Sequence, residues 1–409
     1  MTNRQAAIKV IKRLRSGGFQ ALLAGGCVRD MLLGRAAKDF DVATDARPRD
    51  VIAFFKRTLK VGAKFGVVIV LLDNRQIEVA TFRTETGYLD GRHPAKVEFT
   101  GPAEDARRRD FTINGMFYDP AEKNVIDYVN GRADLKKRIV RTIGPADDRF
   151  AEDYLRMLRA VRFSTQLGFA VDRGTKSAVR KNAQKITAIS GERIAAELEG
   201  ILADPNRAAG AAMLIETRLA EAIFPGLTAQ QTDFAVKVLA QLRKKVDFPL
   251  ALACFFAGCT AAFALDRIRL LRLSRNQTKH VKFLLTNTGR LLDDRMSLGP
   301  LKMLLAEPYF WDLYEFQRAL QKASDRSRRA LAPLIKLRRR IRNLGDVELR
   351  PRPLLNGREL MRLGAVPGPA LGQLAQELYI AQLEGTLQTA EQAENWVKKW
   401  LKKHKDTTE

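Results

Sequence analysis

The first third of the chain shows two different hydrophobic periodicities. Apolar side chains recur at helical spacing over residues 3–15, which predicts an amphipathic helix, and residues 51–59 predict a second helix. The apolar runs 67–72 and 77–82 have the composition of β-strands, and the polar residues between them predict a hairpin. This part of the chain is therefore expected to be α/β.

Beyond residue 200 the pattern becomes helical. Apolar and basic positions alternate over residues 208–246 and again over 250–292, and no internal repeat is evident. We expect an α/β head, built on a small mixed sheet with helices, followed by all-α segments. The expected domains are a head at 1–145, a helical neck at 146–205, a helical body at 206–345 and a helical tail at 346–409.

The stretch Leu23-Ala-Gly-Gly-Cys-Val-Arg-Asp30 combines features of a phosphate-binding turn. Gly25 and Gly26 would let backbone N–H groups approach a phosphate because they carry no side chain. Arg29 adds a guanidinium fork that suits phosphate oxygens. Residues 30–34 predict a short helix whose N-terminus faces the same anion. A lone Gly-Gly pair is most often only a turn, so the motif becomes specific only together with neighbouring residues.

Two aspartates come next in the chain, on either side of Phe40. Alternate side chains of a strand share a face, so Asp39 and Asp41 are expected to point one way while Phe40 points into the core. Two hard oxygen ligands at this spacing suit a pair of Mg²⁺ ions. The combination resembles the catalytic signature of the DNA polymerase β-like nucleotidyltransferases. That resemblance implies a third carboxylate on a neighbouring strand, and Glu78 matches it.

Polar residues further along would complete a nucleotide site. Asp110 and Asn114 lie one helical turn apart after three successive arginines, and with Arg109 they suit the triphosphate and the ribose hydroxyls. An arginine run is often only a solvated surface. Residues 84–94 are polar and contain glycine, which predicts a surface loop or a mobile loop beside the active site.

Three longer segments, Arg108–Asn114, Glu152–Phe163 and Gly191–Leu198, carry a closer resemblance, which extends over about residues 20–205. With the Gly-Gly and Asp-x-Asp motifs, they are similar to the class II tRNA nucleotidyltransferase and bacterial poly(A) polymerase family. Gly115 stands where that family more often has Ala or Ser. The resemblance implies a nucleotidyltransferase head that uses CTP, ATP and two Mg²⁺ ions at the tRNA 3′ end. The segments are Arg108-Arg-Asp-Phe-Thr-Ile-Asn114, Glu152-Asp-Tyr-Leu-Arg-Met-Leu-Arg-Ala-Val-Arg-Phe163 and Gly191-Glu-Arg-Ile-Ala-Ala-Glu-Leu198.

In that family the helix that starts near Glu152 acts as a protein template. Asp153, Arg156 and Arg159 are three residues apart and would share one helical face. An aspartate acceptor beside an arginine donor can satisfy the edge of cytosine or adenine, but not equally that of guanine or uracil. The same motif assigns Arg162 to the nucleotide-binding set. In an unrelated helix these charges would form an ordinary ion pair.

The charge of the chain favours a polyanionic partner. It has 71 Lys and Arg against 46 Asp and Glu, a formal net charge of +25. No apolar run is long enough to span a bilayer, and the N-terminus lacks the features of a signal peptide. We therefore expect a cytoplasmic RNA- or DNA-handling protein that does not bind membranes, and no obligate protein partner is evident from the sequence. The three cysteines form no zinc spacing, and the three histidines are too few and scattered for the histidine–aspartate phosphohydrolase domain of some relatives.

Residues 322–352 are strongly basic. A charge run is usually a solvated surface, but beside the motifs above a surface that binds RNA backbone is favoured. The tail resembles the C-terminal segment of tRNA nucleotidyltransferases and is expected to help hold the acceptor and elbow region of tRNA. The arginines assigned to RNA binding are Arg338, Arg339, Arg340 and Arg342.

The resemblance leaves the product open. We favour CCA addition, in which CMP and AMP are transferred and pyrophosphate is released. The family's poly(A) polymerases share the motifs but tend to have a longer segment before the Arg-Arg-Asp motif and a basic, disordered-looking C-terminus. An enzyme that adds only the terminal A also fits, and one that adds only CC fits less well because the loop at 84–94 looks complete. A non-catalytic RNA-binding protein on the same fold would not need the intact carboxylates.

Overall fold

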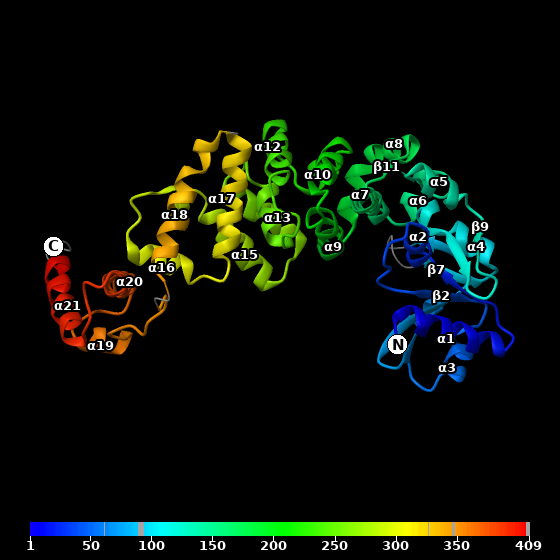
Figure 1. Ribbon diagram of the computed structural model, residues 1–409, viewed down its shortest axis with the longest axis horizontal. Helices are drawn as coiled ribbons and strands as arrows, with labels where there is room; N and C mark the ends of the chain where they lie inside the picture. The colour runs from blue at the N-terminus through cyan, green and yellow to red at the C-terminus, as the bar shows by residue number, and fades with distance from the viewer. Residues whose placement is uncertain (61, 89–93, 326, 346–347, 406–409) are drawn as a thin grey trace. The chain divides into compact units, whose positions relative to one another are not determined.

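The computed structural model has an α/β N-terminal part and a helical remainder, as the sequence predicts (Figure 1). Among the described residues, no helix is long and apolar enough to cross a membrane. The structure describes residues 1–60, 62–88, 94–325, 327–345 and 348–405.

A seven-stranded mixed sheet forms the centre of the N-terminal part. Five of the six neighbouring strand pairs are antiparallel, whereas β2 and β5 run parallel. The predicted hairpin is confirmed as β4 and β5. The strands, in spatial order, are β3 (Thr58–Leu59), β4 (Val67–Leu72), β5 (Arg75–Thr81), β2 (Asp41–Thr44), β1 (Ala21–Ala24), β8 (Met116–Asp119) and β9 (Asn124–Asp127).

The alternation of side chains along β2 and β5 decides where the carboxylates point. Val42 and Val79 are register partners, and both belong to the core that includes the apolar face of α1 (Asn3–Ser16). Since successive side chains of a strand point to opposite faces, Asp41 and Glu78 must point away from that core. The parallel pairing thus places two carboxylates side by side on the other face of the sheet.

Two predicted helices begin and end at other residues. α2 spans Gly26–Leu32 rather than 30–34, because Gly25, with φ of +74°, turns the chain directly from β1 into the helix. α3 spans Pro48–Phe54 rather than 51–59. The residues after it extend and form β3, which pairs with β4.

The segment predicted as a loop at 84–94 is mostly strand. β6 (Arg83–Tyr88) and β7 (Pro94–Phe99) form a separate antiparallel hairpin, and its residues 89–93 lie outside the described residues. Alternating Thr and other strand-compatible residues satisfy their backbone groups by pairing within the hairpin.

The remaining elements are helices, apart from the short parallel pair β10 (Ile139–Val140) and β11 (Ala170–Val171). The helices up to residue 223 are α4 (Pro102–Arg107), α5 (Gly131–Lys137), α6 (Ala146–Glu152), α7 (Leu155–Leu167), α8 (Arg173–Asn182), α9 (Gly191–Leu202), α10 (Arg207–Glu216) and α11 (Leu219–Ile223). The later helices are α12 (Ala229–Leu239), α13 (Phe248–Phe255), α14 (Ala261–Ile268), α15 (Arg275–Thr286), α16 (Leu298–Leu305), α17 (Phe310–Ser324), α18 (Ala332–Asn343), α19 (Gly357–Arg362), α20 (Pro369–Leu383) and α21 (Ala390–Lys405).

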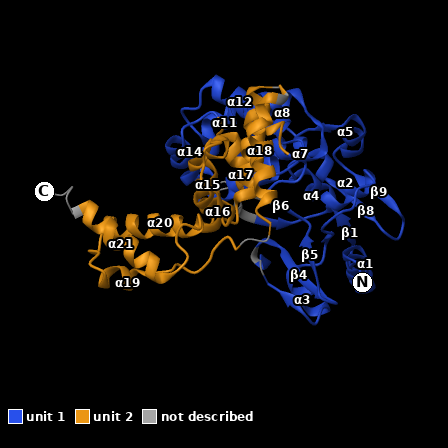
Figure 2. Ribbon diagram, turned by 60° about the vertical axis from the view of Figure 1, so that its left-hand side comes forward, with its two compact units in different colours: residues 1–236, 243–248, 258–273 blue, residues 237–242, 249–257, 274–409 orange. Residues whose placement is uncertain are grey.

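The chain forms two compact units (Figure 2). The first contains the sheet and the helices α1 to α11, and the second contains α15 to α21. This division is coarser than the head, neck, body and tail expected from the sequence, and those four domains remain a prediction. The units comprise residues 1–236, 243–248 and 258–273, and residues 237–242, 249–257 and 274–409.

Candidate active site

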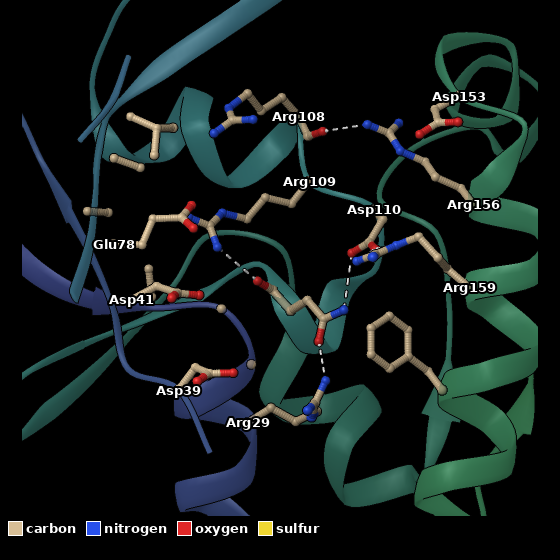
Figure 3. A pocket seen from close by; sticks show the side chains of 18 of the residues that line it. Arg29, Asp39, Asp41, Glu78, Arg108, Arg109, Asp110, Asp153, Arg156 and Arg159 are labelled. Carbon is tan, nitrogen blue, oxygen red and sulfur yellow. Dashed lines mark hydrogen bonds and ion pairs between the residues drawn. The ribbon is translucent and has the colours of Figure 1, made fainter. Parts of the chain in front are cut away.

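One cavity in the first unit, of about 700 Å³, brings together every residue that the sequence assigns to catalysis or nucleotide binding (Figure 3). Eight arginines and five carboxylates line it, so it suits a ligand that carries several negative charges. The assigned residues are Gly25, Gly26, Arg29, Asp39, Asp41, Glu78, Arg109, Asp110, Asn114, Asp153, Arg156, Arg159 and Arg162.

The acidic side of the cavity comes from the sheet. Asp41 begins β2 and Glu78 lies in β5, at neighbouring register positions. The sequence predicts that Asp39 and Asp41 share a strand. This prediction is wrong for Asp39, because β2 begins only at Asp41. All three carboxylates nevertheless line the cavity, on one side of it in Figure 3. Phe40 packs against the core, as predicted.

Burial and neighbouring negative charge raise pKa values on the acidic side of the cavity. Burial raises the pKa of Asp41 to about 6, the neighbouring Glu78 and Asp39 add to the effect, and Arg109 opposes it. Burial, and then Asp41, raises the pKa of the Cys27 thiol to about 11, which keeps that thiol neutral. Asp41 therefore ionises less readily than an ordinary aspartate, and a further cation beside it would favour its ionised form.

The donor set fits Mg²⁺ only in part. Among the described residues, no three His, Cys, Asp or Glu side chains converge tightly enough to hold a metal by themselves. Mg²⁺ in nucleotide enzymes usually takes one or two carboxylates and completes its shell with water and substrate phosphates. Asp39 and Asp41, with Glu78 nearby, match that incomplete kind of site.

The raised pKa of Asp41 leads to a stability prediction. The folded pKa lies above the unfolded value near 3.9, so this group stabilises the fold below pH 4, and that contribution is lost as pH rises through about 6. We expect Asp41→Asn to raise the free energy of unfolding by up to about 3 kcal/mol at pH 7.5 in EDTA. Urea denaturation at pH 7.5 and pH 4.5 measures this. An equal difference at both pH values would contradict it.

The turn that the sequence assigns to phosphate binding depends on Gly25. Its φ is +74°, and a Cβ there would lie 3.0 Å from Nη1 of Arg109. A side chain would therefore be strained and would displace that guanidinium. Arg29 follows in α2 and donates from Nη1 to Oδ1 of Asn114 at 2.7 Å. The turn thus leads directly to Arg29 and leaves room for the guanidinium of Arg109, and both groups line the cavity.

A chain of polar contacts links α2 to α7. Asn114 accepts from Arg29 and donates to Oδ1 of Asp110 at 3.1 Å, and the other oxygen of Asp110 pairs with Nη2 of Arg159 at 2.6 Å. Although burial opposes it, Arg159 and then Asn114 hold the pKa of Asp110 below its usual range. The predicted helical spacing of Asp110 and Asn114 is wrong, because a single 3₁₀ turn, Thr112–Asn114, brings them together.

Asp105 is a positioning residue that the sequence reasoning missed. It is 1% exposed and pairs with Nη2 of Arg108 at 2.7 Å and with Nη2 of Arg109 at 2.9 Å. Burial opposes its ionisation, but Arg109 and then Arg108 hold its pKa below the usual range. The signal was present as an aspartate three and four residues before two arginines.

The segment that the sequence assigns to base selection differs from the predicted helix. α6 ends at Glu152, α7 begins at Leu155, and Asp153 between them has an extended backbone with φ of −155° and ψ of 106°. The sequence predicts that Asp153 shares a helical face with Arg156 and Arg159. This prediction is wrong, because Asp153 lies between the two helices. All three side chains still line the cavity.

Asp153 pairs with Arg193, another residue that was missed. Oδ2 of Asp153 lies 2.6 Å from Nη2 of Arg193 in α9, and its Oδ1 accepts the backbone N–H of Leu155 at 3.0 Å. Arg193 belongs to a motif that the sequence singled out without giving it a role. Its contact fixes the carboxylate, and the lone pairs that remain are available to a ligand.

Arg156 is held by other groups. It pairs with Glu152 and donates to the backbone carbonyls of Arg149 at 3.0 Å and Arg108 at 3.3 Å. The guanidinium has five N–H donors, so these contacts orient it and leave donors for a base edge. Asp153 and Arg156 are thus positioned separately rather than as a pair.

Phe163 is the third residue that was missed. Its ring is 7% exposed, and three guanidinium carbons lie over it, those of Arg29 at 5.2 Å, Arg159 at 5.2 Å and Arg162 at 4.4 Å from the centroid. An aromatic residue at helical spacing usually indicates only a core position. Here the electron-rich face of the Phe163 ring attracts three guanidinium groups, one from α2 and two from α7, and so lets these like charges lie near one another.

We expect Phe163→Leu to raise KM for CTP about tenfold with a smaller change in kcat, because a desolvated cation–π contact contributes about 1–2 kcal/mol. Phe163→Tyr keeps the ring face and should stay near wild type. Phe150→Leu is the matched control, since Phe150 is fully buried in the same unit and no arginine lies over its ring among the described residues. Equal KM changes in Phe163→Leu and Phe150→Leu would contradict the role.

The departure at Gly115 has a steric reason. A Cβ there would lie 2.7 Å from Cγ2 of Val129 and 3.0 Å from Cδ1 of Ile143. An alanine or serine at this position would therefore require one or both of these side chains to shift.

Comparison with known proteins agrees with this geometry. Residues 21–141 match the family model described as "Poly A polymerase head domain", and residues 168–231 match "Probable RNA and SrmB- binding site of polymerase A". The CCA-adding enzyme of Lacticaseibacillus paracasei is 34% identical over 388 residues, which cover 94% of this chain and 93% of that protein.

The chain belongs to the CCA-adding enzyme family. A second CCA-adding enzyme, from Geobacillus kaustophilus, is 44% identical over 227 residues, 55% of this chain and 56% of that protein. The crystal structure of the Bacillus stearothermophilus CCA-adding enzyme in complex with CTP has a TM-score of 0.80 and 29% identity and covers 100% of both chains. The predicted family and fold class are confirmed.

Proposed function

We propose that this chain adds CCA to the 3′ end of tRNA, transferring CMP and AMP from CTP and ATP with release of pyrophosphate. The observation that carries the proposal is a single cavity in which three carboxylates face a set of arginines. This distribution suits a nucleoside triphosphate, whose phosphates need cationic partners, together with the attacking 3′-hydroxyl of the RNA, which would be activated beside the carboxylates.

The acidic side would hold the metal. Asp39 and Asp41, with Glu78 as an additional carboxylate, would bind two Mg²⁺ ions, which when bound supply Lewis-acid activation of the RNA 3′-hydroxyl and neutralise triphosphate charge. Asp41 and Glu78 hold this charge on one face of the sheet, on two neighbouring interior strands, so the triphosphate would be held in one register relative to the 3′ end.

The basic side would hold the nucleotide. Backbone groups at Gly25 and Gly26, with Arg29 and Arg109, would bind phosphate oxygens. Arg159 and Arg162 lie over Phe163 on the α7 side and would add positive charge beside the triphosphate. Asp110 would position Arg159 and Asn114 would position Arg29 through the contacts described above, and both residues are assigned to the ribose hydroxyls.

Base selection would come from Asp153 and Arg156. Each is oriented by a partner other than the base, and both line the cavity, where one would offer an acceptor and the other a donor. Cytosine and adenine both present an amino donor next to a ring acceptor, whereas uracil and guanine present the opposite order and would leave buried groups unpaired.

The second unit would hold the rest of the RNA. The exposed arginines of α18, Arg338, Arg339 and Arg342, would contact the RNA backbone. The helices α19 to α21 of the tail would contact the acceptor and elbow region. The net charge of +25 supports this assignment.

A product analysis tests the proposal. Purified protein with Mg²⁺, CTP and ATP should extend a tRNA transcript that lacks CCA by CCA and then stop, and EDTA should abolish the reaction. An oligo(A) primer is the control substrate and should remain unextended. Long A tails on that primer would make the chain a poly(A) polymerase instead.

A further inference from the structure

An apolar surface is exposed on two helices of the second unit. Trp311 of α17 is 56% exposed and Ile335 of α18 is 49% exposed. These helices lie side by side in Figures 1 and 2. Tyr314 connects the two residues, since its ring lies 5.8 Å from that of Trp311 and it lines a shallow cavity of about 240 Å³ together with Ile335. Large exposed apolar side chains that cluster in this way mark a binding surface.

Three arginines complete the lining of this cavity. Arg338, Arg339 and Arg342 follow Ile335 at three, four and seven residues, so all four lie on one face of α18. All three arginines are exposed, and none forms an ion pair with a carboxylate among the described residues. We call these three arginines with Trp311, Tyr314 and Ile335 the α17–α18 patch.

The acidic groups on these helices are engaged elsewhere. Oδ2 of Asp312 lies 3.0 Å from Nε2 of His280, and Glu315 pairs with Arg318 at 2.6 Å. The net charge of the patch is therefore strongly positive, which complements a polyanion.

Arg340 is not part of the patch. It is half-buried and donates to the backbone carbonyl of Met296, whereas the other three arginines stay exposed. Of the four arginines that the sequence assigns to RNA, only three thus lie on the exposed basic face. The fourth provides a control in the same helix.

We infer that the α17–α18 patch binds the RNA substrate through both its backbone and a base. Arg338, Arg339 and Arg342 hold phosphates, and the exposed ring of Trp311 stacks on an unpaired base of the same RNA. Aromatic rings flanked by guanidinium groups are the usual platform for unstacked bases, because every base has a π-face and a nearby phosphate. This inference rests on the proposed function, since it takes tRNA as the ligand.

A protein occupant is the competing possibility. A second copy of this chain would also carry a charge of +25, so repulsion opposes self-association through a basic face. RNA satisfies the aromatic and the cationic parts of the patch together, through its bases and its phosphates.

The test uses the full chain and a tRNA transcript that lacks CCA. Its variants are Trp311→Ala, Trp311→Phe, the triple change of Arg338, Arg339 and Arg342 to alanine, and Arg340→Ala as the control. The readouts are the tRNA dissociation constant at several salt concentrations, KM for tRNA and kcat. Urea midpoints confirm that each variant is folded.

The triple variant should lower the log–log salt slope of binding by about 2, because each phosphate contact contributes about 0.7–0.9. Trp311→Ala should weaken binding about tenfold with the salt slope unchanged, as expected for loss of one stacked base. Trp311→Phe should recover most of that loss. In the variants of patch residues, KM for tRNA should rise while kcat stays near wild type. Arg340→Ala should match wild type in both tRNA binding and KM.

Several results would overturn the inference. One is that both the triple variant and Trp311→Ala bind tRNA as tightly as wild type. A second is that Arg340→Ala and the triple variant lose tRNA affinity equally. A third is that the variants lose self-association while their tRNA binding is unchanged. A wild-type protein that binds tRNA through the patch but adds no nucleotide would instead reject the proposed function alone.

Discussion

Replacing Asp39 and Asp41 together by alanine is expected to lower kcat for nucleotide addition by at least about 10³-fold. Both carboxylates line the acidic side of the cavity, and charge stabilisation by bound metal contributes several kcal/mol, each 1.4 kcal/mol corresponding to about tenfold in rate. Equilibrium binding of CTP should fall far less, because the arginines on the opposite side are unchanged. Single-turnover kinetics and CTP binding separate the two effects.

Asp73→Ala is the matched control for this variant. Its carboxylate is 61% exposed at the turn between β4 and β5, in the same sheet but outside the cavity. The control should keep wild-type turnover. If the double variant retains turnover within tenfold of wild type, the carboxylates are not the metal site and the assigned chemistry is wrong.

Arg156→Ala is expected to have the second largest effect, on base choice. The ratio of kcat/KM for CTP to that for UTP, and for ATP to that for GTP, should fall by about 10- to 100-fold, since a well-placed bidentate pair contributes about 1–3 kcal/mol of discrimination. KM for tRNA should change little. Competition assays with paired nucleotides on one tRNA transcript measure these ratios.

Arg149→Ala controls for the loss of charge near the base. Arg149 also pairs with Glu152, at 2.9 Å, but does not line the cavity. Misincorporation should therefore stay at the wild-type level in this variant. Equal discrimination by wild type and Arg156→Ala would remove Arg156 from the template.

The membership of the cavity could be predicted from the sequence because it depends on local motifs. Gly25 and Arg29 lie within five residues of one another, and the alternation of a strand places Glu78 on the face opposite Val79. Such short-range rules hold in most folds. The strand β1, the helix α1 and the hairpin of β4 and β5 were predictable for the same reason.

The partners within the cavity could not be predicted, because they come from distant parts of the chain. Asp153 pairs with Arg193, forty residues away, and Arg159 with Asp110, forty-nine residues away. A helical periodicity suggested that Asp153 and Arg156 belong together. The helix break at Asp153 separates them, and no local propensity distinguishes a break from a continuous helix at that point.

The role of Phe163 was hidden by its residue type. A buried phenylalanine in an amphipathic helix is typical of a core, and only the positions of three arginines from two helices show that its ring face is a support for charge. The same holds for Arg340, which bonds to Met296 while the arginines near it in the sequence are exposed. Side-chain environment, rather than sequence pattern, decides both cases.

The central claim is ordered CCA addition in one cavity, and one measurement tests it directly. Three tRNA transcripts, ending before CCA, after the first C and after the second C, are each offered Mg²⁺ with CTP, ATP or both. We predict that CTP alone completes CC on the first two transcripts, that ATP alone extends only the third, and that both together give CCA and then stop. Addition of A to the third transcript with no addition of C to the others, or continued growth beyond CCA, would contradict the claim.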